Sequence, residues 1–239
     1  MNDTVKLHTQ NVRMIAHRGL SGIERENTNA AFVAAGNRSY YGIETDIHRT
    51  IDGHFVIYHD DNTFRLTDVD WNVEEHTLEE LRSLVLKDLD NCKRTDLVLP
   101  TLDEYIRICK KYGKISVLEL KNHFECADIQ RIVETIQNEG WINQTIFISF
   151  DLENLIVLRN LLPKQKMQYL VYQISPELPS VLKMYSLDVD VKYAGLKPEH
   201  VKLLHEAGCE INVWTVNSYD DGLRMIEMGV DFITTNILE

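Results

Sequence analysis

Cysteine is scarce in this sequence, with four residues among 239, at positions 92, 109, 126 and 209. No two of them form a Cys-x-x-Cys pair, and none stands in a zinc-like spacing with histidine. This pattern excludes a disulfide framework and a structural zinc site. We therefore expect four free thiols in a protein of a reducing compartment.

Long apolar runs are also missing. None approaches the ~20 residues that a membrane helix needs. The first eleven residues, MNDTVKLHTQN, lack the apolar segment of a secretory signal. The sequence therefore predicts a cytoplasmic protein with no stable membrane insertion.

Positive charge is in deficit: 25 Lys and Arg stand against 37 Asp and Glu, a net charge of −12. No basic cluster could follow a phosphate backbone, so we expect no nucleic-acid partner. An acidic protein that acts on an anionic substrate needs a metal ion, or a few well-placed basic residues, to overcome its own field. The oligomeric state stays open between monomer and homodimer, because no clear apolar patch is visible in the sequence.

Apolar segments alternate with helix-like segments along most of the chain. The expected strands lie at 12–17, 43–47, 115–120, 145–149, 167–171, 187–191, 211–215 and 231–235. Near-continuous apolar strands between helices indicate a parallel sheet covered on its outer face. Eight such units in this length predict an α/β fold of the (β/α)₈ TIM-barrel type, as a single domain over 1–239. An open doubly wound sheet is the alternative, but no G-x-G-x-x-G follows the first strand.

A polar segment after the second strand interrupts this regularity. We expect a small insertion at about 60–99, with a helix beginning near residues 77–80 (TLEE). The run at 55–58 is predicted to form an extra antiparallel strand beside the second barrel strand.

Residues 41–59 read as a hairpin around Asp52-Gly53, a strong signal for a two-residue type I′ turn. That turn pairs position 46 with position 59. Because side chains alternate along a strand, Glu44, Asp46 and His59 are then expected on one side, with Asp46 opposite His59.

In a barrel, functional residues sit where the strands end. Polar or aromatic residues end several of the expected strands, namely His17-Arg18, Glu44 and Asp46, Glu119 and Lys121, Ser149-Phe150, and Trp214. We expect these side chains to meet at one mouth.

Glu44, Asp46 and Glu119 place three carboxylates at that mouth. Hard oxygen ligands suit Mg²⁺ or Ca²⁺ better than zinc, and such an ion can stabilise charge on a phosphoryl oxygen. Arg18 and Lys121, from neighbouring strand ends, are candidates for holding the other phosphate oxygens.

His17 and His59 flank the predicted metal site and are candidates for a general acid and base near neutral pH. Trp214 offers a flat apolar wall for a small alcohol group, although an aromatic residue here could equally belong to the core. Phe150 is ambiguous in the same way. We expect surface positions for a further set of histidines: His8, His54, His76, His123, His200 and His205.

A series of motifs then occurs in a fixed order over residues 12–236. The motifs are His17-Arg18-Gly19, Glu26-Asn27-Thr28, Glu44-x-Asp46, His59-Asp60, Pro100-Thr101-Leu102, Glu119-x-Lys121, Ser149-Phe150, Trp214-Thr215-Val216-Asn217 and Thr235-Asn236. In this order they resemble the glycerophosphodiester phosphodiesterase family.

The resemblance implies a TIM barrel that hydrolyses glycerophosphodiesters, such as glycerophosphocholine or glycerophosphoethanolamine, to sn-glycerol 3-phosphate and an alcohol with Mg²⁺ or Ca²⁺. The family's metal ligands fall on Glu44, Asp46 and Glu119. Its acid/base pair falls on His17 and His59, and its phosphate-holding residues fall on Arg18 and Lys121.

One position departs from the family, because Arg25 stands where a proline usually precedes Glu-Asn-Thr. Arg25 is therefore a candidate for substrate contact. Two alternatives stay open: a lysophospholipase D-type activity on lysophospholipids, and a barrel that binds phosphodiesters without catalysis.

Overall fold

The computed structural model describes residues 3–239 of the chain. Within them, nine strands form a single sheet in the order β1-β9-β8-β7-β6-β5-β4-β2-β3, and β1 also pairs with β2. The strands are β1 (Arg13–Ala16), β2 (Gly42–Arg49), β3 (Phe55–Ile57), β4 (Ile115–Leu120), β5 (Thr145–Ser149), β6 (Met167–Val171), β7 (Asp188–Lys192), β8 (Ile211–Trp214) and β9 (Phe232–Thr235).

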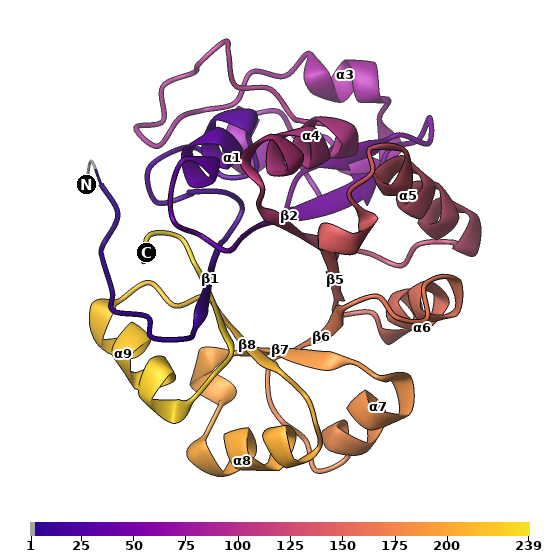
Figure 1. Ribbon diagram of the computed structural model, residues 1–239. Helices are drawn as coiled ribbons and strands as arrows, with labels where there is room; N and C mark the ends of the chain where they lie inside the picture. Colours follow the sequence, from indigo (N-terminus) through magenta and orange to yellow (C-terminus); the bar gives the residue numbers. More distant parts are fainter. Residues whose placement is uncertain (1–2) are drawn as a thin grey trace.

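The β1–β2 pairing closes eight parallel strands into a ring, with helices around it (Figure 1). This closed ring confirms the (β/α)₈ barrel and rules out the open doubly wound sheet. The expected extra strand is also present, since β3 runs antiparallel to β2 outside the ring.

Helices follow the strands as the sequence predicts. They are α1 (Asn29–Gly36), α2 (Phe64–Thr67), η1 (Val73–Glu75), α3 (Leu78–Arg82), α4 (Leu102–Tyr112), α5 (Cys126–Asn138), η2 (Ile142–Gln144), α6 (Leu152–Leu161), α7 (Leu178–Tyr185), η3 (Tyr193–Gly195), α8 (Pro198–Glu206) and α9 (Tyr219–Met228). Local signals set several of the ends. Thr28 accepts a hydrogen bond from the Ala31 amide at the start of α1, and Gly113 ends α4 with a positive φ of 64°.

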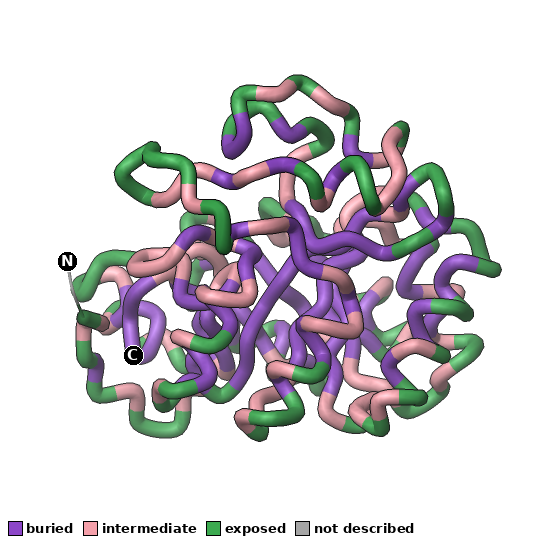
Figure 2. The backbone as a smooth tube through the Cα atoms, turned by 90° about the horizontal axis from the view of Figure 1, so that it is seen from above, coloured by how far each residue is buried: buried purple, intermediate pink, exposed green. Residues whose placement is uncertain are grey.

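Alternation along the strands separates two cores. The outward-facing Ile43 and Ile47 of β2 belong to the large core between the sheet and the helices. The barrel interior holds a smaller cluster made of Ile15, Val117, Ile146, Ile148, Leu170 and Phe232. Buried residues accordingly run through the middle of the molecule, and exposed ones follow its periphery (Figure 2).

The hairpin turn is one residue longer than predicted. The amide of Thr50 donates to the carbonyl of His54 at 2.9 Å, which closes a three-residue loop in which Gly53 has a φ of +79°. A glycine in the left-handed region at the end of such a loop is typical of a type I turn with a bulge. The predicted two-residue type I′ turn is therefore wrong.

The extra loop residue shifts the pairing of the hairpin by one position. Ile47 pairs with Ile57, so Asp46 lies opposite Tyr58, whose amide donates to the Asp46 carbonyl at 3.1 Å. The predicted pairing of Asp46 with His59 is wrong. His59 follows the end of β3 and reaches the mouth from the loop.

The segment between β3 and α4 has a hydrophobic cluster of its own. It consists of Val56, Tyr58, Leu66, Val73, Leu81, Leu84, Leu86, Leu97 and Leu99. The expected helix start at 77–80 is confirmed, since Thr77 and Glu80 form a capping box at α3. The segment lies to one side of the ring, near α1 and α4 (Figure 1).

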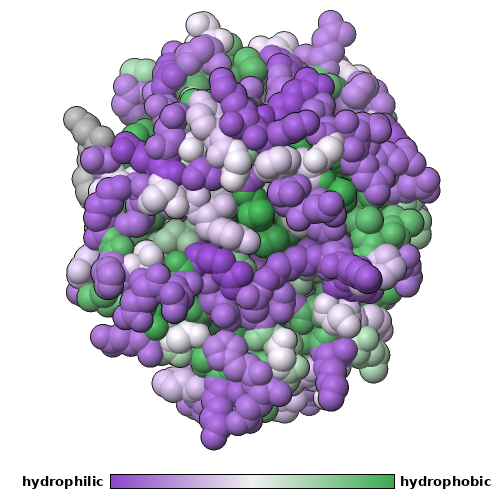
Figure 3. Space-filling model, viewed as in Figure 1, coloured by the Kyte–Doolittle hydropathy of each residue, from purple (hydrophilic) through white to green (hydrophobic). Residues whose placement is uncertain are grey.

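Three further observations bear on the sequence predictions. The four cysteines are free thiols, with Cys109 and Cys209 buried and Cys92 and Cys126 exposed. Among residues 3–239, no helix has the length and apolar character that crossing a bilayer requires. Hydrophilic side chains dominate the face drawn in Figure 3, with hydrophobic residues in small groups between them.

Candidate active site

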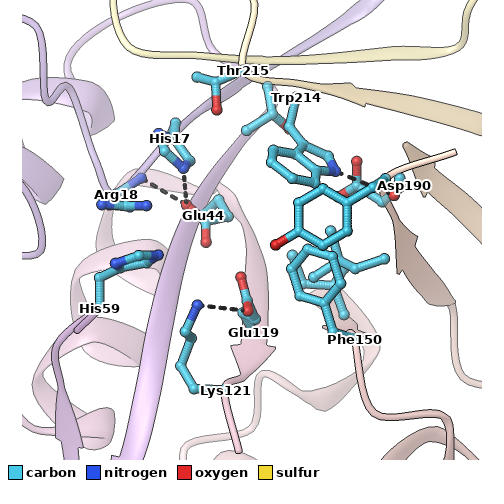
Figure 4. A pocket seen from close by; sticks show the side chains of 14 residues that line it. His17, Arg18, Glu44, His59, Glu119, Lys121, Phe150, Asp190, Trp214 and Thr215 are labelled. Atoms are coloured by element: carbon cyan, nitrogen blue, oxygen red, sulfur yellow. Dashed lines mark hydrogen bonds and ion pairs between the residues drawn. The ribbon is translucent and has the colours of Figure 1, made fainter. Parts of the chain in front are cut away.

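A cavity of about 260 Å³ opens where the barrel strands end. All eight barrel strands, or the loops after them, contribute lining residues: His17, Arg18, Glu44, His59, Glu119, Lys121, Ile148, Phe150, Leu170, Tyr172, Asp190, Trp214, Thr215 and Thr234. Except for Asp46, which is buried directly beside it, every residue predicted for the mouth as a ligand, acid, base, cation or wall lines this one cavity (Figure 4).

Three carboxylates gather at one side of the cavity. Glu44 and Asp46 alternate with the outward-facing isoleucines of β2, and Glu119 of β4 is the register partner of Asp46. One oxygen from each lies within 4.8 Å of the others, and all three residues are buried. Buried like charges at this spacing repel unless a cation lies among them. The set of oxygen donors therefore fits a hard divalent cation.

The pKa values of the three carboxyl groups reflect their burial and the charges beside them. Burial, with the charges of Asp46 and Glu119 added, raises the pKa of Glu44 well above its usual value. Burial and Asp46 raise the pKa of Glu119 to about 7. Burial opposes ionisation of Asp46 as well, but Arg18 and Lys121 outweigh it and lower its pKa. Asp46 also keeps one oxygen, Oδ1, without a hydrogen bond.

Two cations face these carboxylates from neighbouring strand ends. Lys121 Nζ lies 3.0 Å from Glu119 Oε1 and 3.6 Å from Asp46 Oδ1. Arg18 Nε lies 3.5 Å from Asp46 Oδ2, and the Arg18 amide donates to Glu44 Oε2 at 2.8 Å. Both side chains are mostly buried, so an anion that enters the cavity meets two positive charges with little solvent screening.

The turn that carries Arg18 is built from unusual backbone. Arg18 and Gly19 both have positive φ, at 55° and 77°. A Cβ on Gly19 would lie 2.7 Å from backbone and side-chain atoms of Ala31, so this position requires glycine. The close approach lets α1 pack directly behind the turn.

Each of the two predicted catalytic histidines has its Nδ1 held by a partner. His17 Nδ1 lies 2.7 Å from Asn236 Oδ1, and His59 Nδ1 lies 2.7 Å from Asp60 Oδ1. The other nitrogen of His17, Nε2, lies 4.0 Å from Glu44 Oε2. Burial, followed by the charge of Arg18, lowers the pKa of His17 to about 4.

A chain of ion pairs joins the two sides of the site, and it was not predicted. Glu26 accepts from Arg18 at 2.8 Å and from Arg65 at 2.7 and 3.1 Å. Arg65 also donates to Asp60 at 2.6 Å, and Asp60 orients His59. Arg65 thereby links the Arg18 side to the His59 side. The sequence places Arg65 in the insertion but gives no indication of these contacts.

Aromatic residues form the opposite wall of the cavity. Phe150 stacks on Tyr172 with ring centroids 5.0 Å apart, and Trp214 meets each of them edge-on at 5.6 Å. We call these three residues the aromatic wall. Trp214 thus lines the cavity as predicted, and Phe150 lies beside it, while Tyr172 had no sequence signal.

Other side chains were misjudged or overlooked. Arg25 faces the insertion, where it donates to the carbonyls of Lys87 and Asp88, so the expectation of a substrate contact finds no support. Asn27 orients the Asp46 carboxylate, because its Nδ2 donates to Asp46 Oδ2 at 2.8 Å. His48, which the sequence did not single out, is fully buried near the end of β2, where its Nδ1 lies 3.2 Å from Glu74 Oε1 of the insertion.

Taken with the fold, these positions define a class of protein. Acidic, basic and imidazole side chains gathered at the carboxyl ends of barrel strands are the arrangement of a TIM-barrel enzyme. Phosphate is the anion that two basic side chains beside a carboxylate cluster suit best.

Comparison with known proteins narrows the class to a family. The chain matches the model of the glycerophosphoryl diester phosphodiesterase family over residues 17–239. A glycerophosphodiester phosphodiesterase of Caldanaerobacter subterraneus subsp. tengcongensis is 30% identical to it over 227 residues, which span 93% of each chain.

Similar solved structures point to the same family. A glycerophosphodiester phosphodiesterase from Parabacteroides distasonis superposes with a TM-score of 0.80 at 30% identity, covering 95% of this chain and 93% of the other. A phosphodiesterase from Oleispira antarctica, solved in complex with the product sn-glycerol-3-phosphate, has a TM-score of 0.82 at 24% identity and covers 97% and 95%.

The chain therefore belongs to the glycerophosphoryl diester phosphodiesterase family. This confirms the resemblance seen in the sequence and the enzyme class that it implied, a glycerophosphodiester phosphodiesterase.

Proposed function

We propose that this enzyme hydrolyses glycerophosphodiesters such as glycerophosphocholine or glycerophosphoethanolamine to sn-glycerol 3-phosphate and an alcohol, and that it needs a divalent cation. The observation that carries the proposal is the gathering of three buried carboxylates, two basic side chains and two oriented imidazoles around one cavity. The Oleispira phosphodiesterase of the same fold, solved with sn-glycerol-3-phosphate, is consistent with this product.

Glu44, Asp46 and Glu119 would hold the cation, Mg²⁺ or Ca²⁺. Bound there, it supplies positive charge that stabilises the developing charge on a phosphoryl oxygen. Arg18 and Lys121 bind the remaining phosphate oxygens. Because both are largely buried, they also fix the diester in one orientation.

His17 and His59 carry the protons. One imidazole accepts the proton of the attacking hydroxyl, while the other donates a proton to the oxygen of the leaving alcohol. In the version we favour, a glycerol hydroxyl attacks phosphorus to form a cyclic phosphate, which water then opens with the two histidines in exchanged roles. Asn236 and Asp60 hold the Nδ1 atoms, so Nε2 is the nitrogen that exchanges protons.

The aromatic wall contacts the alcohol that leaves. Its rings, with Ile148 and Leu170, form the apolar half of the cavity. The carbon atoms of a small alcohol can pack against these apolar side chains.

The lysophospholipid alternative gains no support from the insertion. Most of its leucines pack in their own cluster, and the Trp71 ring stacks on His76 at 4.6 Å. Phe64 and Leu89 are exposed, but neither lines the cavity, so the insertion offers no apolar groove beside it for an acyl chain. A binding role without catalysis is disfavoured because the complete set of acid, base and ligand candidates is assembled.

The cytoplasmic location, the oligomeric state and the division into one domain with an insertion stay predictions.

Release of glycerol 3-phosphate from glycerophosphocholine tests the proposal directly. We expect no release in EDTA and recovery with added Mg²⁺ or Ca²⁺. His59→Ala should abolish release while metal binding persists, and His54→Ala, at the exposed hairpin tip, serves as the control. Folded protein that releases nothing with either metal would overturn the proposal, and a rate near that of the parent in His59→Ala would overturn the acid/base assignment.

A further inference from the structure

Asp190 is a buried carboxyl group at the cavity, and one of its two oxygens has no partner. It lies on β7, lines the cavity and is 1% exposed. Its Oδ1 atom makes no hydrogen bond. The side chain of Asn212, on the neighbouring strand, donates to Gln168 Oε1 at 3.1 Å and accepts from Thr234 Oγ1 at 3.1 Å. It also interacts with the Asp190 carboxyl group, which lowers the pKa of Asp190 but leaves Oδ1 without a partner.

A buried carboxyl oxygen without a partner is costly, because it has lost water and gained no hydrogen bond in return. Burial foremost, with the charge of Glu119 added, raises the pKa of Asp190 well above its usual value. A nearby positive charge would reverse this effect and favour the carboxylate. Among the described residues, no Lys, Arg or His acts on the charge of Asp190. Apart from a metal ion at Glu119, the positive charge would therefore come from the ligand.

The position of Asp190 gives the cavity two electrostatic halves. Arg18 and Lys121 lie on one side of the cavity, and Asp190 lies across it beside Trp214 (Figure 4). The indole Nε1 of Trp214 donates to the backbone carbonyl of Asp190 at 3.3 Å, which fixes the aromatic wall and the acid relative to each other. A phosphate on the basic side therefore directs its apolar-side substituent toward Asp190.

We propose that Asp190 makes this enzyme selective for diesters whose alcohol arm ends in a primary ammonium group. This rests on the proposed function, since it assumes that a phosphodiester occupies the basic side. A zwitterion with phosphate at one end and ammonium at the other matches the polarity of the cavity. The aromatic wall adds cation–π attraction beside the carboxylate.

Two other roles would satisfy the same carboxyl group. A neutral acid could bond a hydroxyl of a glycerol arm, or Asp190 could serve only the polar layer that Gln168, Asn212 and Thr234 form inside the barrel. Neither role depends on the negative charge. Asp190→Asn keeps the size and a hydrogen-bonding oxygen but removes the charge, so it separates these roles from ammonium recognition.

The experiment compares kcat/KM for glycerophosphoethanolamine, glycerophosphocholine and glycerophosphoglycerol in the metal-loaded enzyme and in Asp190→Asn. For the ethanolamine diester we expect a fall of about tenfold to a hundredfold, the range of one charged hydrogen bond. The choline diester, which lacks an N–H donor, should fall less, and the glycerol diester, whose alcohol arm carries no charge, should change less than about threefold. Asp188→Asn, on the same strand but away from the cavity, is the matched control and should leave the substrate ranking unchanged.

Equal losses on all three substrates in Asp190→Asn would overturn the inference in favour of a hydroxyl contact or an internal structural role. Kinetics of Asp190→Asn that match the parent on all three substrates would overturn it outright. If the parent enzyme turns over none of the diesters, the proposed function fails, and calorimetry then decides the inference separately. Phosphoethanolamine should bind the parent at least tenfold more tightly than Asp190→Asn, and methyl phosphate should bind both alike. Equal binding of phosphoethanolamine would refute ammonium recognition.

Discussion

Arg65 offers a sharp test of how the site is held together, because it touches no substrate-facing atom directly. Its guanidinium bridges Glu26, which holds Arg18, and Asp60, which holds His59. We predict that Arg65→Met lowers kcat/KM about tenfold while the protein stays folded. The main effect should fall on kcat, because Asp60 loses the contact that fixes it beside His59, whereas Arg18 keeps its own bond to Glu26.

The size of the expected loss in kcat/KM follows from the two ion pairs of Arg65. Each of the two charged pairings is worth about 1.5 kcal/mol where it is buried. The Arg65 side chain is 44% exposed, so solvent screening reduces the pair to about 1–2 kcal/mol in total. Since 1.36 kcal/mol corresponds to a factor of ten in rate, the loss is about tenfold.

The assay is steady-state release of glycerol 3-phosphate, with kcat and KM determined separately. Arg65→Lys keeps the charge but not the forked geometry, and it should fall between the parent and Arg65→Met. Arg94→Met is the matched control, since Arg94 lies in the same insertion and pairs with Asp88 and Asp96. Parent-like kinetics in Arg65→Met, or an equal loss in Arg94→Met, would show that the Arg65 bridge does not position His59.

Three further predictions concern the metal site and stability. Glu119→Gln should weaken Mg²⁺ or Ca²⁺ binding at least tenfold by calorimetry, because it removes one charged ligand, and unchanged affinity would exclude Glu119 from the ligand set. His48→Ala should cost about 2 kcal/mol in denaturant unfolding, since it empties a fully buried site and strands its hydrogen-bond partners; a loss below about 0.5 kcal/mol would contradict this. Burial opposes ionisation of Glu239, but hydrogen bonds led by that of Lys6, with Ser39 also contributing, lower its pKa to about 2. Because this value lies below that of an unfolded chain, Glu239 stabilises the fold fully above about pH 4.5 and loses that effect toward pH 2, so the gap in Tm between the parent and Glu239→Gln should be widest near pH 7 and close in acid. A gap that does not depend on pH would show that the charge is irrelevant.

The sequence was sufficient for the barrel and for the carboxylate cluster because both depend on local periodicity. Continuous apolar runs marked the eight parallel strands. Alternation along β2 then placed Glu44 and Asp46 on the inner face, opposite the isoleucines of the outer core. The position of Glu119 was set by the end of its own strand.

Contacts that depend on loop geometry or distant pairing were not predictable. An Asp-Gly pair fits a two-residue and a three-residue loop alike, and Thr50 decides between them by closing the longer loop on His54. No periodic pattern connects Arg65 to Glu26, which lies 39 positions earlier. Asp190 stands in a strand of alternating acids and valines, so its inward direction and its unpartnered oxygen become visible only once the barrel is closed.

The separate hydrophobic cluster of the insertion has an evolutionary consequence. A segment that buries its own leucines can gain, lose or exchange residues without disturbing the packing of the barrel strands. That freedom has two limits. His59, Asp60 and Arg65 belong to the ion-pair chain of the site, and the carbonyls of Lys87 and Asp88 accept from Arg25 of the barrel. Grafts that exchange the segment should therefore keep its N-terminal turn and the backbone that Arg25 contacts.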